Sequence, residues 1–238
     1  MTATISDLGY QVIAASGVYA PQDDSRLLID TLAGSVVVAG RRTVDLCTGS
    51  GVVAIAAARL GACPVSAWDI CPRAIQCTRD NAAAAAVSIE THLGPLSHAL
   101  SEGPYDLVVS NPPYVPTPPG ADEHVPAAAG PAWAWNAGPD GRLILDQLCT
   151  AAPSLLTDGG TMMFVQSEFA GAEESVNALR SAGLSTDVVA QQRIPFGPVL
   201  AARARWLAST GRLRLGCRQE TLVVIRADKR SSAPCPRR

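Results

Sequence analysis

Residues 45–60 read DLCTGSGVVAIAAARL, which combines the end of a strand, a glycine-rich turn and the first part of a helix. Gly49 and Gly51 allow a tight turn and the close approach of a ligand to the backbone, although a plain tight turn needs the same residues. The turn lacks the full GxGxxG pattern that binds a pyrophosphate, and Asp45 would repel a phosphate. A neutral or cationic ligand is therefore expected here.

Short runs rich in β-branched residues alternate with helix-length stretches along the chain. This alternation predicts an α/β fold, in which parallel strands are joined by helical crossovers. The predicted strands are Thr43–Cys47, Pro64–Asp69, Ser88–His92, Tyr105–Ser110, Gly160–Gln166, Thr186–Arg193 and Glu220–Arg226. No clean crossover helix separates the last two, so they are expected to pair antiparallel at the sheet edge. A leading helix is predicted over Ser25–Leu32, with Asp23, Asp24 or Ser25 as its N-cap.

Composition limits the classes of protein that fit. With 238 residues, 47% of them hydrophobic, the chain can bury one substantial core, and one domain is expected. The net charge of -2 provides no general polycation for binding nucleic acid. The charge is uneven, because residues 1–202 contain 9 basic and 19 acidic residues, whereas 203–238 contain 10 and 2. This basic end either meets an anionic partner or is solvated surface.

The seven cysteines form neither CxxC pairs nor a zinc-binding pattern, so reduced thiols and no metal site are expected. The N-terminus lacks the basic-then-apolar layout of a signal peptide, and no apolar run reaches the roughly 18 residues of a membrane span. A cytoplasmic protein without membrane contact is therefore expected.

The second predicted strand ends at Asp69, within SAWDICPRA. Ligands of open α/β sheets bind at the carboxyl ends of the strands. A carboxylate there can accept hydrogen bonds from both hydroxyl groups of a ribose. Asp69 can equally be the N-cap of the helix that starts near Pro72. The two roles are compatible.

Residues 110–116, SNPPYVP, follow the fourth predicted strand and place Asn111 at the same edge of the sheet. Pro112 and Pro113 fix the backbone and have no N–H groups, so the segment presents hydrogen-bond acceptors. The Asn111 side-chain oxygen and the Pro112 carbonyl can accept both hydrogens of a planar NH2 group, beside a flat wall from Tyr114. A turn after a strand is the plainer alternative, since Asn-Pro often starts turns.

Taken together, these strand ends indicate S-adenosylmethionine, an adenosine with a positive charge in place of phosphates. A carboxamide or base amine is a poor nucleophile because its lone pair is delocalised. Holding both N–H bonds turns this lone pair towards the sulfonium methyl group, and such positioning can supply roughly 7–11 kcal/mol of a barrier. The sequence therefore predicts an N-methyltransferase that needs no metal.

The stretches DLCTGSGVVAIA, AWDICPRAIQCTRDN and YDLVVSNPPYVP, in this order, resemble the HemK-type protein glutamine methyltransferases. GVYAPQDDSRLLID, AWAWNAGPDGRLILDQL and RQETLVVIRA resemble blocks of the archaeal and eukaryotic release-factor branch of that family. The resemblance implies a class I methyltransferase fold, a Rossmann-like doubly wound sheet that is mostly parallel with an antiparallel C-terminal edge strand. It also implies methylation of a glutamine amide in a class I peptide-chain release factor.

The resemblance assigns roles by position. The implied cofactor-binding residues are Ser25, Asp45, Cys47, Thr48, Gly49, Gly51, Asp69, Ile70, His92, Leu93 and Asn111. The implied catalytic residues are Asn111, Pro112 and Tyr114, and these are expected to bind the substrate together with Pro113.

Two positions depart from the family pattern. His92 and Leu93 stand where an Asp-Leu pair usually flanks adenine, and only a neutral histidine can accept from the adenine amine. Cofactor binding should then weaken below a pH of roughly 6.5, unless His92 points at water and Leu93 alone closes the slot. Cys47 stands where glycine is common, and because positive φ would cost about 1–2 kcal/mol, an ordinary φ is expected.

Residues 1–228 are expected to form one methyltransferase domain, with a helical cap over 1–35 and an insertion over 195–218. The insertion carries Arg203 and is expected to contact the macromolecular substrate or a partner. The basic tail over 229–238 is expected to be disordered. Trp133 and Trp135 follow SNPPYVP and are expected either to close over the substrate or to pack a loop.

Other functions fit parts of the pattern. An N6-adenine methyltransferase of DNA or RNA would use the same acceptors, but the body of the chain is acidic and no target-recognition region is added. A non-catalytic cofactor-binding module has no need of an intact NPPY. The release-factor branch often has a small zinc-binding activator subunit, so the resemblance also implies that a heterodimer can form.

Overall fold

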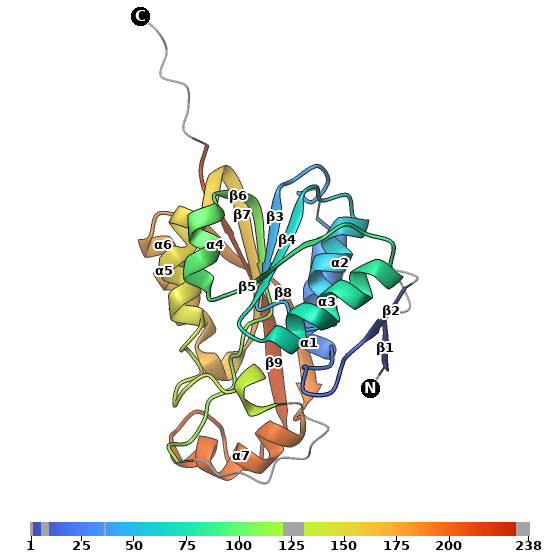
Figure 1. Ribbon diagram of the computed structural model, residues 1–238. Helices are drawn as coiled ribbons and strands as arrows, with labels where there is room; N and C mark the ends of the chain where they lie inside the picture. The colour runs from blue at the N-terminus through green and yellow to red at the C-terminus, as the bar shows by residue number, and fades with distance from the viewer. Residues whose placement is uncertain (1, 6–9, 36, 121–130, 232–238) are drawn as a thin grey trace, which may run out of the picture.

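The computed structural model describes residues 2–5, 10–35, 37–120 and 131–231, and one seven-stranded sheet forms its centre (Figure 1). The strands are β3 (Thr43–Leu46), β4 (Val65–Asp69), β5 (Glu90–Leu93), β6 (Tyr105–Ser110), β7 (Leu156–Ser167), β8 (Ser185–Pro195) and β9 (Gln219–Asp228). Their order across the sheet is β5-β4-β3-β6-β7-β9-β8. Every strand predicted from the sequence is present, and the α/β fold is confirmed.

Strands β3 to β7 are parallel, and β9 runs antiparallel to both of its neighbours. The predicted antiparallel pair is present, with β8 at the edge and β9 one place inside it. The apolar run LVVI at 222–225 is buried because α1 and α6 contact β9 from opposite faces of the sheet, whereas most side chains of β8 are exposed. A buried apolar run inside a sheet and a polar edge strand agree with this order.

Helices cover both faces of the sheet. One face carries α1 (Asp23–Ala33), α2 (Val52–Arg59) and α3 (Pro72–Ala84), and the other carries α4 (Leu96–Glu102), α5 (Leu145–Leu155) and α6 (Ala172–Ser181) (Figure 1). The middle of β6 lies at the centre of the core, where Leu107, Val108 and Val109 are fully buried. This layering brings the carboxyl ends of β3, β4 and β6 together at one edge of the sheet.

The N-terminal part of the chain contains strands as well as the predicted helix. β1 (Thr2–Ile5) and β2 (Tyr10–Ile13) form a separate two-stranded antiparallel sheet. The Ile13 N–H donates to the Asn81 side chain in α3, and the Asn81 amide donates back to the Ile13 carbonyl. The backbone at the end of β2 is therefore joined to α3 by two hydrogen bonds with the Asn81 side chain.

The start of α1 differs from its prediction. Its N-cap is Gln22, without a side-chain cap hydrogen bond, so the predicted caps Asp23, Asp24 and Ser25 all lie inside the helix and the prediction was wrong. Asp24 has a different task, because its carboxylate accepts hydrogen bonds from the Tyr19 and Tyr114 hydroxyl groups.

Helix α7 (Pro198–Ser209) lies between β8 and β9, in the segment predicted as an insertion. Its Arg203 is only 2% exposed and donates to the Pro116 carbonyl and to Asn136 Oδ1, each at 2.7 Å. The guanidinium also lies 4.8 Å over the ring of Trp135. Arg203 therefore holds α7 against the loop that follows β6. It does not reach the surface, so it does not make the predicted contact with a macromolecular substrate.

Beyond β9, Lys229 Nζ donates to the carbonyl oxygens of Pro153 and Leu156, at 2.7 and 2.9 Å. The remainder of the tail predicted to be disordered lies, from residue 232 onward, outside the described residues. Within the described part of the chain, no helix is both long and apolar enough to cross a membrane.

Candidate active site

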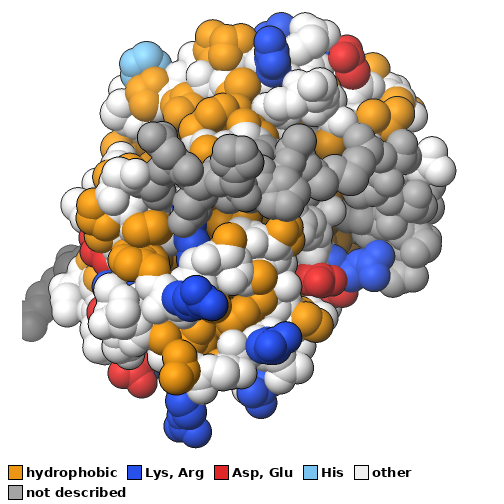
Figure 2. All heavy atoms as spheres, turned by 90° about the horizontal axis from the view of Figure 1, so that it is seen from below, with side chains coloured by type: hydrophobic (Ala, Val, Ile, Leu, Met, Phe, Trp, Pro, Cys, Tyr) orange, Lys and Arg blue, Asp and Glu red, His pale blue; other side chains and the backbone are white. Residues whose placement is uncertain are grey.

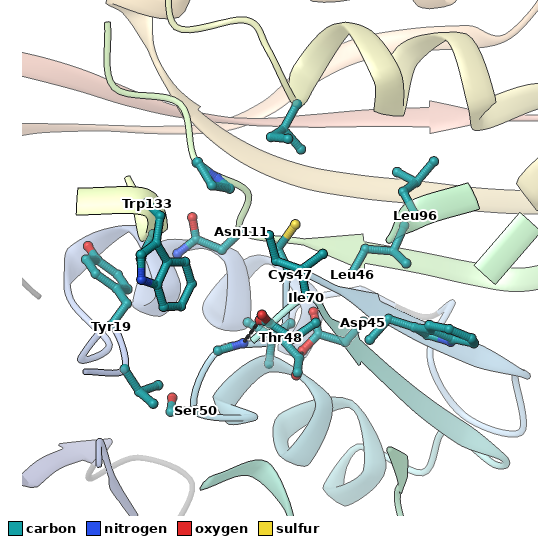
Figure 3. A pocket seen from close by; sticks show the side chains of 18 of the residues that line it. Tyr19, Asp45, Leu46, Cys47, Thr48, Ser50, Ile70, Leu96, Asn111 and Trp133 are labelled. Atoms are coloured by element: carbon teal, nitrogen blue, oxygen red, sulfur yellow. Dashed lines mark hydrogen bonds between the residues drawn. The ribbon is translucent and has the colours of Figure 1, made fainter. Parts of the chain in front are cut away.

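A cavity of about 340 Å³ lies at the carboxyl ends of β3, β4 and β6 (Figure 3). The predicted site residues that line it are Ser25, Asp45, Cys47, Thr48, Gly49, Asp69, Ile70, Asn111 and Pro113. The predicted site residues that do not line it are Gly51, His92, Leu93, Pro112 and Tyr114. The three motifs picked out at the strand ends thus meet around one cavity.

The turn after β3 has left-handed backbone conformations. The φ angles of Cys47, Gly49 and Gly51 are 61°, 57° and 80°. The expectation of an ordinary φ at Cys47 was wrong, because the chain leaves β3 through a left-handed residue, which costs about 1–2 kcal/mol for a side chain with a Cβ. Gly51 is required by packing, since a Cβ there would lie 2.7 Å from Thr78 Cγ2 of α3.

Asp45 is a buried carboxylate with one oxygen left over. Its Oδ2 accepts from the Thr48 hydroxyl at 2.6 Å and from the Ala54 N–H at 3.1 Å. Its Oδ1 is buried and has no hydrogen-bond partner among the described residues. Burial raises the pKa of this carboxyl group to about 7. A donor or a positive charge in the cavity would satisfy the free oxygen and favour the ionised form.

Asp69 joins the two loops at this edge. Its carboxylate accepts from the Gly49 N–H and from the Cys71 N–H, each at 2.9 Å. The N-cap of α3 is Cys71, so Asp69 supports the start of that helix from just outside it. Burial raises the pKa of Asp69. Since a carboxylate has about four lone-pair sites, Asp69 can still accept from a ligand hydroxyl group.

The far wall of the cavity lies at the end of β5, slightly beyond the predicted position. His92 stacks on Trp68, with ring centroids 4.4 Å apart, and its Nδ1 lies 4.0 Å from Glu102 Oε1. The side chain of Leu93 is exposed. The residues that do line the cavity here are Gly94, Pro95 and Leu96, together with Trp68. The strand extends one residue beyond its predicted end, which places the wall in the following turn.

Asn111 occupies the end of the cavity near α1. Its Nδ2 donates to Ser25 Oγ at 3.1 Å, and its Oδ1 has no hydrogen-bond partner among the described residues. The strand that delivers it is held in place because the preceding Ser110 hydroxyl donates to the Leu46 carbonyl at 2.7 Å. Tyr19 and Trp133 line the same end of the cavity (Figure 3). A planar group entering here would meet an oriented amide oxygen between aromatic rings.

Tyr114 does not form the flat wall expected of it in this cavity. Its hydroxyl donates to Asp24 Oδ2 at 3.0 Å, and the residue lines a second cavity behind the NPPY segment. Successive residues of an extended chain point to opposite sides, so Pro113 faces the first cavity and Tyr114 the second. Burial, followed by the charge of Asp24, raises the pKa of the Tyr114 phenol.

Sequence reasoning missed part of the lining. The additional residues include Tyr19, Trp68, Leu96, Ile144 and Gln147. Trp68 could have been found from its place directly before Asp69 at a strand end. Ile144 and Gln147 come from the start of α5, and no sequence pattern indicates that this helix reaches the site. Trp133, considered as a lid, lines the cavity, whereas Trp135 is buried against Arg203.

Comparisons with known proteins agree with this geometry. Residues 9–122 match the family model of the methyltransferase small domain. A protein of Methanocaldococcus jannaschii named as a putative protein N5-glutamine methyltransferase is 32% identical over 187 residues, which cover 79% of this chain and 91% of that protein. The mouse methyltransferase HEMK2 is 36% identical over 179 residues, covering 70% of this chain and 79% of its own.

Solved structures share the fold at lower identity. The E. cuniculi Mtq2-Trm112 complex, described as responsible for methylation of the translation termination factor eRF1, aligns with a TM-score of 0.59 and 22% identity over 90% of this chain and 99% of that one. The T. thermophilus 16S rRNA N2 G1207 methyltransferase, in complex with AdoMet and guanosine, aligns with a TM-score of 0.60 and 19% identity over 97% of this chain and 50% of that one.

Proposed function

Because the chain belongs to the HemK-type family of protein glutamine methyltransferases, we propose that it transfers a methyl group from S-adenosylmethionine to a glutamine side-chain amide of a class I release factor. The observation that carries this proposal is the Asn111 side chain, which Ser25 orients at the end of the cavity and whose oxygen accepts from none of the described residues. An acceptor fixed in this way suits a neutral, planar NH2 group.

The cavity fits the cofactor by its chemistry. The unpartnered Oδ1 of Asp45 provides the negative counterpart for the cationic methionine end of S-adenosylmethionine. Asp69 would accept from the ribose hydroxyl groups, and the exposed apolar surface of Ile70 would cover the adenine ring opposite Leu96. When bound, the cofactor supplies an electrophilic methyl group on a positively charged sulfur.

The chain's own residues would then activate a poor nucleophile. Asn111 Oδ1 would accept one N–H bond of the substrate amide and hold its plane, so that the nitrogen lone pair faces the methyl group; Pro112, expected from the sequence to accept the other N–H, does not line the cavity. Positive charge grows on this nitrogen as its bond to the methyl carbon forms and the sulfur–methyl bond breaks, and the fixed Asn111 oxygen stabilises this charge until the nitrogen loses one proton to water. Positioning of this kind can supply roughly 7–11 kcal/mol of the barrier. A lysine amine needs no such clamp, because its lone pair is not delocalised.

The alternative function, N6-adenine methylation of DNA or RNA, is less well supported than the excess of basic residues in 203–238 alone indicates. Of the basic residues in 203–231, Arg203 is buried, Arg226 pairs with Asp228, and Lys229 donates to two backbone carbonyls. The face that carries α7 shows separate basic side chains among apolar surface rather than one continuous stripe (Figure 2). A duplex-binding protein needs a connected positive surface to neutralise several phosphates.

An activator subunit is part of the proposal. Leu93, at the β5 edge of the sheet, is 54% exposed, and within the described part of the chain β5 pairs with β4 alone. An unpaired edge strand with exposed apolar side chains is a template for a partner. We expect a small subunit that covers this edge to raise activity and solubility.

Methyl transfer from radiolabelled S-adenosylmethionine tests the proposal. The acceptors would be a purified class I release factor, its Gln→Ala variant in the Gly-Gly-Gln loop, and DNA and RNA, each with wild type and Asn111→Ala. We expect label on the release factor that requires both that glutamine and Asn111. Label on nucleic acid alone would move the enzyme to the adenine class. No label on any acceptor, with the activator subunit supplied, would refute the proposal.

A further inference from the structure

The segment that contains α7 carries an unbalanced positive charge. Residues 188–219 contain six arginines and no aspartate or glutamate, whereas residues 1–187 contain 8 basic and 19 acidic residues. Arg203 is buried, and the other five arginines are exposed. We call these five the arginine face: Arg193, Arg205, Arg212, Arg214 and Arg218. Its charge is opposite in sign to that of the chain before it.

Most of the arginine face has no partner within the part of the chain that the structure describes. The Arg212 side chain donates to the Phe169 carbonyl at 3.4 Å, and the side chains of the other four make neither an ion pair nor a hydrogen bond to the described residues. Arginines elsewhere are engaged: Arg42 donates to two backbone carbonyls, and Arg180 pairs with Asp187. The four guanidinium groups are therefore available to another molecule.

The arginine face lies at the active-site end of the sheet. Pro195, at the end of β8, pairs with Gln219, at the start of β9, and β9 runs against the parallel strands. The segment between them is thus beyond the carboxyl ends of those strands, where Figure 1 shows α7. Arg203 also joins α7 to Asn136, which lines the first cavity. A protein that inserts a loop into this cavity would bring its own surface against α7.

Apolar surface accompanies these charges. Leu215, directly after Arg214, is 84% exposed, and Figure 2 shows separate basic side chains among apolar surface on this side of the molecule. Arginine beside apolar groups is typical of protein–protein interfaces, where its guanidinium pairs with carboxylates. A nucleic acid would be matched by a continuous positive stripe. An acidic protein surface would be repelled by the acidic part of the chain and attracted here.

We propose that the arginine face docks an acidic, partly apolar surface of the protein substrate, outside the loop that carries the methylated glutamine. This inference rests on the proposed function for the identity of the substrate. The first cavity then holds the glutamine, while the arginine face adds affinity and speeds the association of the whole protein. Because the buried Arg203 already holds α7 in place, docking requires little further ordering of the enzyme.

Two double variants with the same loss of charge test the arginine face. Arg205→Gln/Arg214→Gln removes two of its charges, and Arg180→Gln/Arg230→Gln removes two exposed charges near the opposite ends of β8 and β9. With whole release factor, the first variant should raise KM about tenfold, since each exposed charge pair contributes up to about fivefold, and kcat should stay within about twofold. The second variant should keep the wild-type KM.

A short substrate separates docking from catalysis. A peptide of the Gly-Gly-Gln loop alone lacks the docking surface, so wild type and both double variants should methylate it with the same KM. Salt should raise the KM for the whole protein in wild type and do so less steeply in Arg205→Gln/Arg214→Gln, because salt screens exposed charges. A KM that rises in this variant for peptide and protein alike, or for neither, would overturn the inference and leave the proposed function intact.

Cross-linking identifies the group that the arginine face meets. Lys229 is the only lysine of the sequence, and its Nζ donates to two backbone carbonyls. Arg214→Lys keeps the charge and adds an amine that a carbodiimide joins to a neighbouring carboxylate as an amide. We expect Arg214→Lys to give a cross-link to an Asp or Glu of the release factor outside its glutamine loop, and Arg180→Lys to give none. Equal cross-linking by both variants would contradict the inference.

Direct binding decides the inference even where no methyl group is transferred. Fluorescent release factor, a fluorescent single-stranded RNA and fluorescent enzyme would each be titrated by anisotropy with wild type and both double variants. Release-factor binding that weakens only in Arg205→Gln/Arg214→Gln supports the arginine face whether or not the glutamine is methylated. Absent or equal binding of the release factor would overturn the inference. Binding of RNA or of a second enzyme molecule that alone depends on Arg205 and Arg214 would also overturn it.

Discussion

Replacing Asp45 with asparagine should stabilise the folded protein while it impairs cofactor binding. The Asp45 carboxylate is 1% exposed, and one of its oxygens has no partner among the described residues. An asparagine can keep the existing bonds, because its Oδ1 can accept from Thr48 and Ala54 in place of the Asp45 oxygen that now does so. The substitution thus removes a buried charge without opening a cavity.

The magnitude follows from the pKa of Asp45. Burial raises it from 3.8 to about 7, a difference of about three units, and at 1.36 kcal/mol per unit this amounts to roughly 4 kcal/mol. Because the folded-state pKa is raised, the folded state holds the proton more tightly. The associated stability is fully present below pH 3.8 and is lost as the pH rises through about 7. Above that pH the buried charge opposes folding.

Urea unfolding at several pH values provides the assay. We expect Asp45→Asn to raise the free energy of unfolding by up to about 4 kcal/mol at pH 8 and by less than about 2 kcal/mol at pH 5, with an unchanged m-value. Asp30→Asn is the control, since Asp30 is an exposed carboxylate of α1, and it should stay within about 0.5 kcal/mol of wild type. A gain that is the same at both pH values, or no gain at pH 8, would refute the reasoning about Asp45.

Three further predictions follow from particular contacts. Cofactor affinity, measured by calorimetry, should fall by up to tenfold per pH unit below about pH 7, because Asp45 takes up a proton. The His92→Gln variant should show the same fall. If the fall disappears in His92→Gln, the histidine and not Asp45 causes the pH dependence. Arg203→Met should lower the free energy of unfolding by roughly 2–5 kcal/mol, because it leaves buried acceptors unpaired. Arg205→Met, at an exposed position of the same helix, should leave the free energy of unfolding unchanged. Equal effects of the two substitutions would contradict the role of Arg203 in holding α7 against the loop after β6. Gly51→Ala should lower the free energy of unfolding by about 2–4 kcal/mol, because of both its positive φ and the contact of the added Cβ with Thr78. Gly49→Ala, where the added Cβ would meet open space, should lower it by only about 1–2 kcal/mol. Similar losses for the two variants in denaturant unfolding would show that packing of Gly51 against α3 is unimportant.

The strands and their ends were predictable because their signal is local. Runs such as DLVVS and LVVI are apolar on both faces, and DLVVS is followed directly by the turn residues Asn111 and Pro112, which indicates a buried strand without knowledge of its neighbours. The polar residue at the end of each run then falls at the same edge of a parallel sheet. Asp45, Asp69 and Asn111 were therefore placed together from the sequence, and the structure sets all three around one cavity.

What the sequence did not indicate depends on contacts between distant segments. Asp24 was predicted as a cap from its place before a helix, but its partners Tyr19 and Tyr114 lie on both sides of it in the chain and meet it only in the fold. Arg203 was assigned to the surface because a basic residue in an insertion usually lies there, and its burial follows from the loop after β6. The second cavity joins five separate segments, so no single motif could indicate it.

The position of the transferred methyl group tests the central claim most directly. Release factor incubated with S-adenosylmethionine and either wild type, Asn111→Ala or the exposed control Asn177→Ala would be digested and sequenced by tandem mass spectrometry, with the rate of modification followed over time. The account predicts one methyl group on the glutamine amide with wild type and Asn177→Ala, and a rate lowered by about 10²–10³ in Asn111→Ala, as for the loss of one fixed group that stabilises transition-state charge. A methyl group on another residue, or an Asn111→Ala rate within about tenfold of wild type, would contradict it.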